Sequence, residues 1–318
     1  MTPIEATARG LARPRRWAGP SIWQRGQGAV VPALLLACSS VTVLTTAGIV
    51  VVLGAEAIEF FRQSGVGLVG FLFGTELNPE AGEYGILPLI WGTFVIAAGS
   101  SLIALPIGLL SAIYLSEYAP RGLRAVLKPT LELLAGVPTI VYGYLGLLLV
   151  TPALKAVLEP LGLRVETFNA LSACIVVGVM IIPMVSSLSE DVLSAVPRGL
   201  REAAYGLGAT KFEVATRVVV PAGLSGVMAS FILAVSRAIG ETMAVVLAAG
   251  SARRLTMNPL TSMQTMTAYI VAVTGGEARY GSPEYLSLFA VGATLFVLTL
   301  ALNVLSGLVL RRYREAYH

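Results

Sequence analysis

The chain has 318 residues, of which 56% are hydrophobic and only 13% are charged, and its formal net charge is +4. Soluble domains typically carry about 25% charged residues, so the composition excludes an ordinary soluble enzyme or binding module. Several stretches of 18 or more nearly uncharged residues predict membrane-spanning segments instead. Because the bilayer core has no water to satisfy backbone polar groups, these segments must be helices. The predicted fold class is an all-α, polytopic membrane protein.

Six transmembrane spans are predicted. In chain order they are 29–53, 86–114, 131–150, 170–188, 222–249 and 285–310. Residues 1–28 are polar and carry five arginines, which predicts an N-terminal tail, and residues 313–318 form a second tail. Residues 29–84 hold the first span and the polar segment after it, and residues 85–312 form a core with the other five spans. The apolar stretch Val66–Phe73 is too short to cross a bilayer, which favours an interfacial position.

The orientation follows from the distribution of lysine and arginine. With the N-terminus inside, the inner segments hold fifteen basic residues and the outer segments hold six. Inner loops of membrane proteins carry the excess of basic residues. The count therefore predicts that both termini and the polar segment 190–221 are cytoplasmic, in the plasma membrane of a bacterium or archaeon.

The segment 190–221 is polar and lies between two long apolar runs. Its pattern predicts a short helix over 197–207, a break at Gly208 and a second amphipathic helix that ends at Pro221. Glycine tolerates the reversed backbone that such a break requires. Proline can open the next helix, because a first-turn residue has no N–H bond to lose.

The span 222–249 contains Arg237 and Glu241. With a rise of 1.5 Å per residue, Arg237 lies roughly 20–25 Å along the span from Pro221, near the middle of the membrane. An ionised residue there costs roughly 2.5–3.5 kcal/mol. At a spacing of four, the two side chains share one face of a helix and can pair. The pair is either a structural ion pair between helices or a charged site on a permeation path.

Several chemistries have no support in the sequence. The phosphate-binding pattern G-x-x-x-x-G-K-[ST] is absent, and the single histidine is the last residue, His318. The cysteines, Cys38 and Cys174, lie in apolar runs without metal or disulfide spacing. We therefore expect no enzyme activity, no cofactor and no metal on this chain, and any ATP hydrolysis that drives it belongs to a separate protein.

Two motifs resemble known permeases. Glu202-Ala203-Ala204, Gly208 and Val218-x-Val220-Pro221 resemble the EAA loop of ABC importer permeases, which usually has Ile and Leu at the two valine positions. The run 236–245, with the sequence SRAIGETMAV, is similar to the phosphate importer permeases and closest to their PstC subunit. The stretches that begin at Gly85 and at Ala135 also look like this family. The run Ala135–Tyr144, with the sequence AGVPTIVYGY, is read as either a packing segment or a pore-lining segment.

The resemblance implies a type I importer fold, a translocation path that includes Arg237 and Glu241, and a coupling segment that includes Glu202, Ala203, Ala204, Gly208 and Pro221. The implied partners are a sister permease (PstA-like), two ATPase subunits (PstB-like), an extracytoplasmic phosphate-binding protein (PstS-like) and inorganic phosphate as cargo. An importer of another oxyanion, molybdate or sulfate, is the first alternative. A secondary transporter is a further alternative, but it leaves the EAA segment unexplained.

Overall fold

A computed structural model describes residues 22–276 and 278–312 of the chain. The tail 313–318 and most of the tail 1–28 lie outside the described residues. The chain divides into two compact units, Met1–Val52 and Leu53–His318, and each is described by itself. In the described part, six helices are long and apolar enough to cross a membrane, which confirms the predicted fold class and the number of spans.

The described part of the first unit is one helix. It belongs to α1 (Ile22–Ser64), which begins before the predicted span 29–53 and ends after it. From Val30 to Val52 the large apolar side chains are exposed on every side of this helix. A helix that is apolar all round needs lipid or another protein around it, as expected for a membrane span.

The centre of the second unit consists of α3 (Leu87–Ile113), α7 (Ala170–Ala195) and α10 (Val220–Gly240). A π-helical turn over Tyr114–Tyr118 continues α3. The helices α3 and α7 pack closely because small residues lie between them: a Cβ on Gly108 would meet Val185 Cγ1 at 2.6 Å. Association through small residues is typical of membrane helices.

The third span lies further along the chain than the prediction 131–150. A separate amphipathic helix, α4 (Arg121–Ala135), occupies most of the predicted loop 116–130. After a break at Gly136–Pro138, a continuous helix runs over α5 (Thr139–Leu145), a π-helical turn (Gly146–Val150), α6 (Thr151–Leu158) and a 3-10 turn (Glu159–Leu161). The predicted loop 151–169 is therefore helical over its first half. Because both helices contribute apolar residues around it, hydropathy did not predict the break between them.

The fifth span also differs from its prediction. The short helix α8 (Arg198–Gly206) is followed by Gly208 in a left-handed conformation (φ +84°), so the predicted helix and break are confirmed. The next helix, however, does not end at Pro221. It runs unbroken over α9 (Lys211–Val214), a π-helical turn (Ala215–Val219) and α10, and Pro221 lies inside it. A short helix, α11 (Met243–Ala249), follows after a break at Glu241.

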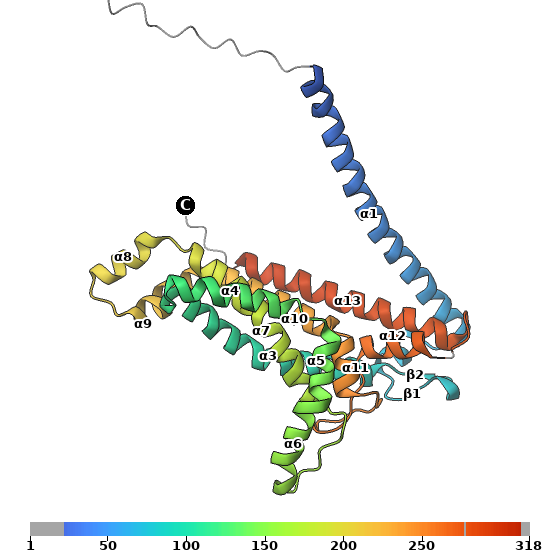
Figure 1. The fold of residues 1–318 in the computed structure, drawn as a ribbon. Coiled ribbons are helices and arrows are strands. Elements are labelled where there is room, and N and C mark those ends of the chain that lie inside the picture. Colours follow the sequence, from blue (N-terminus) through green and yellow to red (C-terminus); the bar gives the residue numbers. More distant parts are fainter. Residues whose placement is uncertain (1–21, 277, 313–318) are drawn as a thin grey trace, which may run out of the picture. The chain divides into compact units, whose positions relative to one another are not determined.

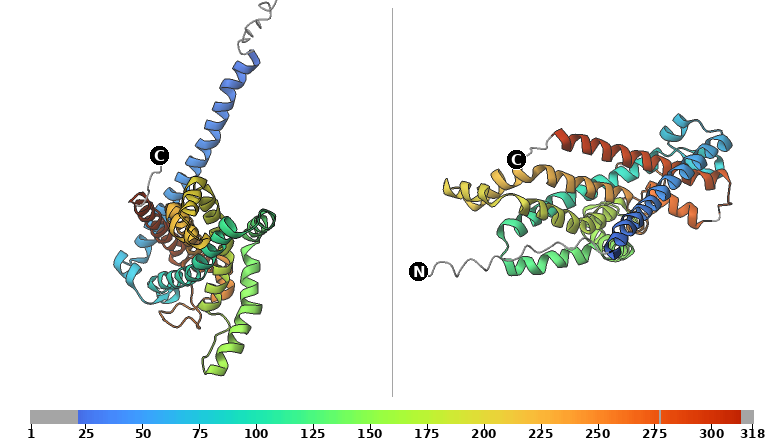
Figure 2. Two further views of the ribbon diagram at one scale, coloured as in Figure 1. Left: turned by 90° about the vertical axis from the view of Figure 1, so that its left-hand side faces the viewer. Right: turned by 90° about the horizontal axis from the view of Figure 1, so that it is seen from above.

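The opposite end of this unit carries the small elements α2 (Leu68–Phe73), β1 (Leu77–Asn78), a 3-10 turn (Pro79–Ala81) and β2 (Glu83–Tyr84). Phe71 of α2 is buried against Phe60 and Phe61. The predicted loop 250–284 contains the helix α12 (Met266–Gly275), which is buried over its first turn and lies beside α13 (Pro283–Arg312). Figures 1 and 2 show α8 and α9 at one end of the second unit and the strands at the other; we call these the α8 end and the strand end.

Candidate functional site

Arg237 lies at the middle depth of the helix bundle. The helices α7 and α10 are antiparallel, since Gly223 packs on Leu193 and the Ser189 and Ser230 hydroxyls form a hydrogen bond of 2.7 Å. Arg237 is seven residues beyond Ser230, which places it level with about position 182 of α7. With a rise of 1.5 Å per residue, that level is about 18 Å from one end of α7 and about 20 Å from the other.

The predicted pairing of Arg237 with Glu241 on one helix face is wrong. α10 ends at Gly240, and the backbone of Glu241 is extended (φ −67°, ψ 131°). The Arg237 side chain is exposed, whereas Glu241 is buried. Among the described residues, the ion pairs within 4.0 Å do not include these two. The helix break removes the spacing of four on which the pairing depended.

Glu241 instead organises the break between α10 and α11. Its Oε1 accepts a hydrogen bond of 3.3 Å from the backbone N–H of Ala244, in the first turn of α11. Its backbone carbonyl accepts a hydrogen bond of 2.9 Å from the Thr267 hydroxyl, at the start of α12. Broken helices at mid-membrane depth commonly form substrate and ion sites in transporters. The break therefore adds a second feature beside the arginine that sequence patterns did not predict.

The run 135–144 reaches this region through α5. An added Cβ on Gly143 would meet Ala244 and Leu247 of α11 at 3.0 Å, and one on Gly146, just after α5, would meet Val176 at 2.8 Å. Glycine is required here because the α5 backbone approaches its neighbours closely. This contact favours the packing interpretation for Gly143, while Ile140, Val141 and Tyr144 are exposed.

The predicted coupling residues lie on the segment that projects at the α8 end. Glu202 and Ala203 are exposed, and Ala204 packs on a small apolar cluster that includes Val214 and Val219. Leu207 is 90% exposed, and it lies next to Gly208 at the turn. The side chain of Thr210 accepts from the Glu213 N–H, and the Glu213 side chain accepts from the Thr210 N–H, forming a capping box. This projecting segment therefore has a capped helix start, and it exposes the apolar side chains of Leu207 and Phe212. Pro221 lies apart from it, inside the continuous helix.

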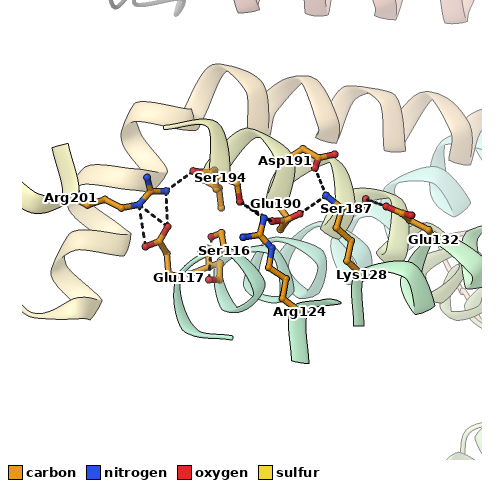
Figure 3. A network of polar contacts seen from close by, with 12 residues as sticks. Ser116, Glu117, Arg124, Lys128, Glu132, Ser187, Glu190, Asp191, Ser194 and Arg201 are labelled. Carbon is orange, nitrogen blue, oxygen red and sulfur yellow. Dashed lines mark hydrogen bonds and ion pairs between the residues drawn. The ribbon is translucent and has the colours of Figure 1, made fainter. Parts of the chain in front are cut away.

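A network of charged side chains connects this segment to the bundle, as Figure 3 shows. Glu190 of α7 is fully buried and pairs with Arg124 and Lys128 of α4. Arg201 of α8 pairs with Glu117 at 2.9 Å. It also donates to the carbonyls of Leu193 and Val196, at 2.7 and 2.5 Å. Among the described residues, the network holds α8 against the end of α7 and the turn that continues α3, and it holds α4 against α7. A cavity of about 340 Å³ lies beside it, lined by Ser116, Glu117, Arg124, Ser194, Arg198, Arg201, Glu202 and Tyr205.

Sequence patterns did not predict this network. Arg121, Arg124 and Lys128 recur at the spacing of one helix face, and Glu190 follows the apolar run 170–188. The spacing of the basic residues could have predicted the helix α4, although it does not identify Glu190 as the acid that pairs with Arg124 and Lys128. The break at Glu241 had a weaker signal, because a glycine followed by a polar pair is also common inside helices.

The sequence and fold of the chain match known permeases. Residues 104–315 match the family described as binding-protein-dependent transport system inner membrane component. A probable ABC transporter permease protein, YqgH of Bacillus subtilis, is 35% identical over 84% of this chain and 85% of its own length. The phosphate transport system permease protein PstC of Xylella fastidiosa (strain Temecula1) is 38% identical over 77% of this chain and 79% of its own length.

Solved structures support the fold. A chain of a bacterial alginate ABC transporter, in complex with an alginate-bound periplasmic protein, aligns with a TM-score of 0.64 and 16% identity, covering 93% of this chain and 99% of that one. A chain of the MetNI methionine ABC transporter aligns with a TM-score of 0.53 and 16% identity, over 73% and 95% of the two chains. Together with the family match, these likenesses confirm the expected importer permease fold. The chain belongs to the binding-protein-dependent transport system inner membrane component family, the permease subunits of ABC transporters.

Proposed function

We propose that this chain is a membrane permease subunit of an ATP-driven importer of inorganic phosphate. The observation that carries the proposal is Arg237, an exposed arginine at mid-membrane depth, four residues from a helix break. In lipid, such a charge is costly, so intramembrane arginines face a protein interior or an aqueous path. Within the described residues, no hydrogen bond or ion pair satisfies its guanidinium. The side chain is therefore available to a passing anion.

Phosphate is the favoured cargo because of both chemistry and relationship. A guanidinium offers forked donors that match the oxygens of a tetrahedral oxyanion. Permeases named for phosphate transport from several organisms are 31–38% identical to this chain. Sulfate and molybdate are also tetrahedral, so the competition experiment below decides between them and phosphate as the cargo.

Glu241 has a different proposed role from that of a direct arginine partner. Its carboxylate caps α11 and its carbonyl is held by Thr267. We propose that Glu241 lies along the same path and shapes the break, while Arg237 makes the transient contact with the anion. Because no carboxylate among the described residues pairs with Arg237, its guanidinium can bind the anion. It releases the anion when the path opens to the other side of the membrane.

We propose different partners for the two ends of the bundle. The projecting segment over α8 and α9 docks into a separate ATPase, of which we propose two copies, and a sister permease completes the path beside α10. A phosphate-binding protein delivers the cargo at the strand end. In this arrangement the strand end is extracytoplasmic and both chain termini are cytoplasmic, in agreement with the excess of basic residues at the α8 end.

The test is Arg237→Lys, which keeps the charge and removes the fork. The complex of permeases, ATPase and binding protein is reconstituted in vesicles, and phosphate uptake is measured with sulfate and molybdate as competitors. Loss of one charged hydrogen bond, about 1.5–3 kcal/mol, predicts at least tenfold slower uptake from a normally assembled complex. Arg217→Lys, an exposed site on the same continuous helix, is the matched control and is expected to transport normally.

Uptake close to the unmodified level with Arg237→Lys would contradict the transport role of this arginine. Failure of that variant to assemble would favour a structural role. Uptake of sulfate or molybdate by the unmodified complex, without uptake of phosphate, would replace the proposed cargo.

A further inference from the structure

Buried polar side chains connect the helix break to the loop at the strand end. Gln264, Thr265 and Thr267 are all buried. Thr267 donates to the carbonyl of Glu241 at 2.9 Å, and its hydroxyl lies 3.0 Å from that of Thr265. Gln264 accepts a hydrogen bond of 3.1 Å from Nε of Arg253. The break is thus connected to Arg253 on the loop by these hydrogen bonds and by the peptide bond that joins Thr265 to Gln264.

The segment 264–267 is wedged between α3 and the break. The hydroxyl of Thr93 accepts a hydrogen bond of 3.1 Å from the Met266 N–H. An added Cβ on Gly92 would clash with the Gln264 carbonyl oxygen, so only glycine permits this approach. The segment is therefore fixed on the α3 side, and a shift of the segment would move its contact with Glu241.

Arg253 fixes the outer end of this connection. Its guanidinium lies 5.4 Å from the centre of the Tyr269 ring, and one terminal nitrogen donates to the Leu77 carbonyl of β1 at 3.3 Å. Arg253 thus joins the loop, α12 and the strand that precedes α3. A partner that displaces the strand end would pull on this arginine.

The hydroxyl of Thr267 does not make the usual contact of a helical threonine. Threonines inside helices commonly donate to the carbonyl four residues earlier, as Thr274 does to Ile270 at 2.7 Å. Thr267 is in the first turn of α12, so no such carbonyl is available within the helix, and it donates across to Glu241. The Glu241 carbonyl follows the end of α10, where carbonyls lose their partners within the helix. A buried carbonyl in a membrane protein needs such a partner.

We propose that Thr267 is a positioning residue for transport: its hydroxyl holds the break between α10 and α11 and links it, through Gln264, to Arg253 at the strand end. The inference rests on the proposed function in one respect, since it assumes that the break lies on the translocation path. Displacement of the strand end then reaches the break without any contact between the partner and the path.

The experiment compares Thr267→Val, which removes the hydroxyl at nearly constant shape, with Thr267→Ser, which keeps it. Thr274→Val is the matched control on the same helix. Two quantities are measured on the reconstituted complex: amide hydrogen exchange of peptides covering 240–249, and phosphate transported per ATP hydrolysed. We expect Thr267→Val to speed exchange at least tenfold and to lower the transport ratio at least fivefold. The serine variant and the control should stay within twofold of the unmodified complex.

The ratio separates positioning from mere destabilisation, because loss of folded complex lowers uptake and hydrolysis together. An unchanged exchange rate or an unchanged ratio with Thr267→Val would overturn the proposal, as would an equal effect of Thr267→Ser. Should the valine variant not assemble, Gly92→Ala displaces the same segment from the α3 side, and unchanged exchange at 240–249 in that variant would overturn it. If the unmodified complex takes up no phosphate, the proposed cargo fails, but the exchange comparison still decides the role of Thr267 at the break.

Discussion

Replacing Glu190 with alanine tests whether burial determines the strength of the charged network. Glu190 is 0% exposed and pairs with Arg124 and Lys128, which are 37% and 27% exposed. Its neighbour Asp191 shares Lys128 but is 58% exposed. Desolvation lowers the pKa of Lys128, but the hydrogen bonds and charges of Asp191 and Glu190 outweigh it and leave that pKa above 10.5. The contribution of Lys128 to folding stability is therefore fully present below pH 10.5. It is lost only as the pH rises through the higher pKa that Lys128 has in the folded protein.

The magnitude follows from the contacts. Glu190→Ala removes the hydrogen bonds from Arg124 and Lys128, each worth about 1.5–3 kcal/mol, together with a third from the Ser194 hydroxyl. Because water can reach both stranded cations, we expect a total loss near the lower end, about 3 kcal/mol. Asp191→Asn removes an exposed pair, worth less than about 1 kcal/mol. At about 2–4 °C per kcal/mol for a chain of this size, the melting temperature should fall by about 6–12 °C in the first variant and by less than about 4 °C in the second.

The assay uses the buried thiol of Cys174 as reporter. With the exposed Cys38 replaced by serine, a thiol-reactive dye reports unfolding of the detergent-solubilised chain on heating. Equal shifts for Glu190→Ala and Asp191→Asn would refute the argument, because they would show that burial of the carboxylate adds nothing. A shift below about 2 °C for Glu190→Ala would show that the two cations find equivalent partners.

Three further predictions concern the turn, the topology and the packing. Gly208→Val forces a branched side chain into a left-handed conformation (φ +84°), which costs about 1–2 kcal/mol. We expect ATP hydrolysis to continue in this variant while phosphate uptake falls severalfold. Normal coupling of hydrolysis to uptake would exclude the docking role of this turn. Single cysteines in a cysteine-free background should react with an impermeant reagent from outside at Glu80 and only from inside at Lys211, and the reverse pattern would invert the topology. Gly108→Ala should lower the melting temperature because its Cβ would meet Val185 at 2.6 Å, whereas Gly122→Ala, with open space around it, should not; equal shifts would contradict the close α3–α7 packing.

Hydropathy and short-range signals predicted the parts of this fold that depend on local chemistry. The number of spans follows from the apolar runs, and Gly208 follows from its place between two polar helical patterns. The boundary at Pro221 could not be obtained in this way. A π-helical turn over Ala215–Val219 precedes the proline and lets the helix continue, and only the packed structure contains that register change.

The site residues Arg237 and Glu241 remain a prediction, and the geometry predicted for them is wrong. A spacing of four predicts a shared face only if the helix continues, and α10 ends between Arg237 and Glu241. The carbonyl at that end is satisfied by Thr267, 26 residues further along the chain. A partner at such a distance leaves no local pattern, so sequence reasoning about Arg237 and Glu241 alone favoured the wrong pairing.

The two arginines that matter most here differ in what surrounds them. Arg124 lies at the α8 end and has acid and hydroxyl partners within the chain, Glu190 and Ser194. Arg237 lies at mid-depth and is exposed, without such a partner in the described part of the chain. A stability role would favour burial and pairing of Arg237, as for Arg124, because an unpaired charge in the membrane is expensive. Under the proposed function, the exposed face of α10 is one wall of a path, and its other wall belongs to a second permease chain. A single chain of this protein is then expected to bind its anion weakly until that second wall is assembled beside α10.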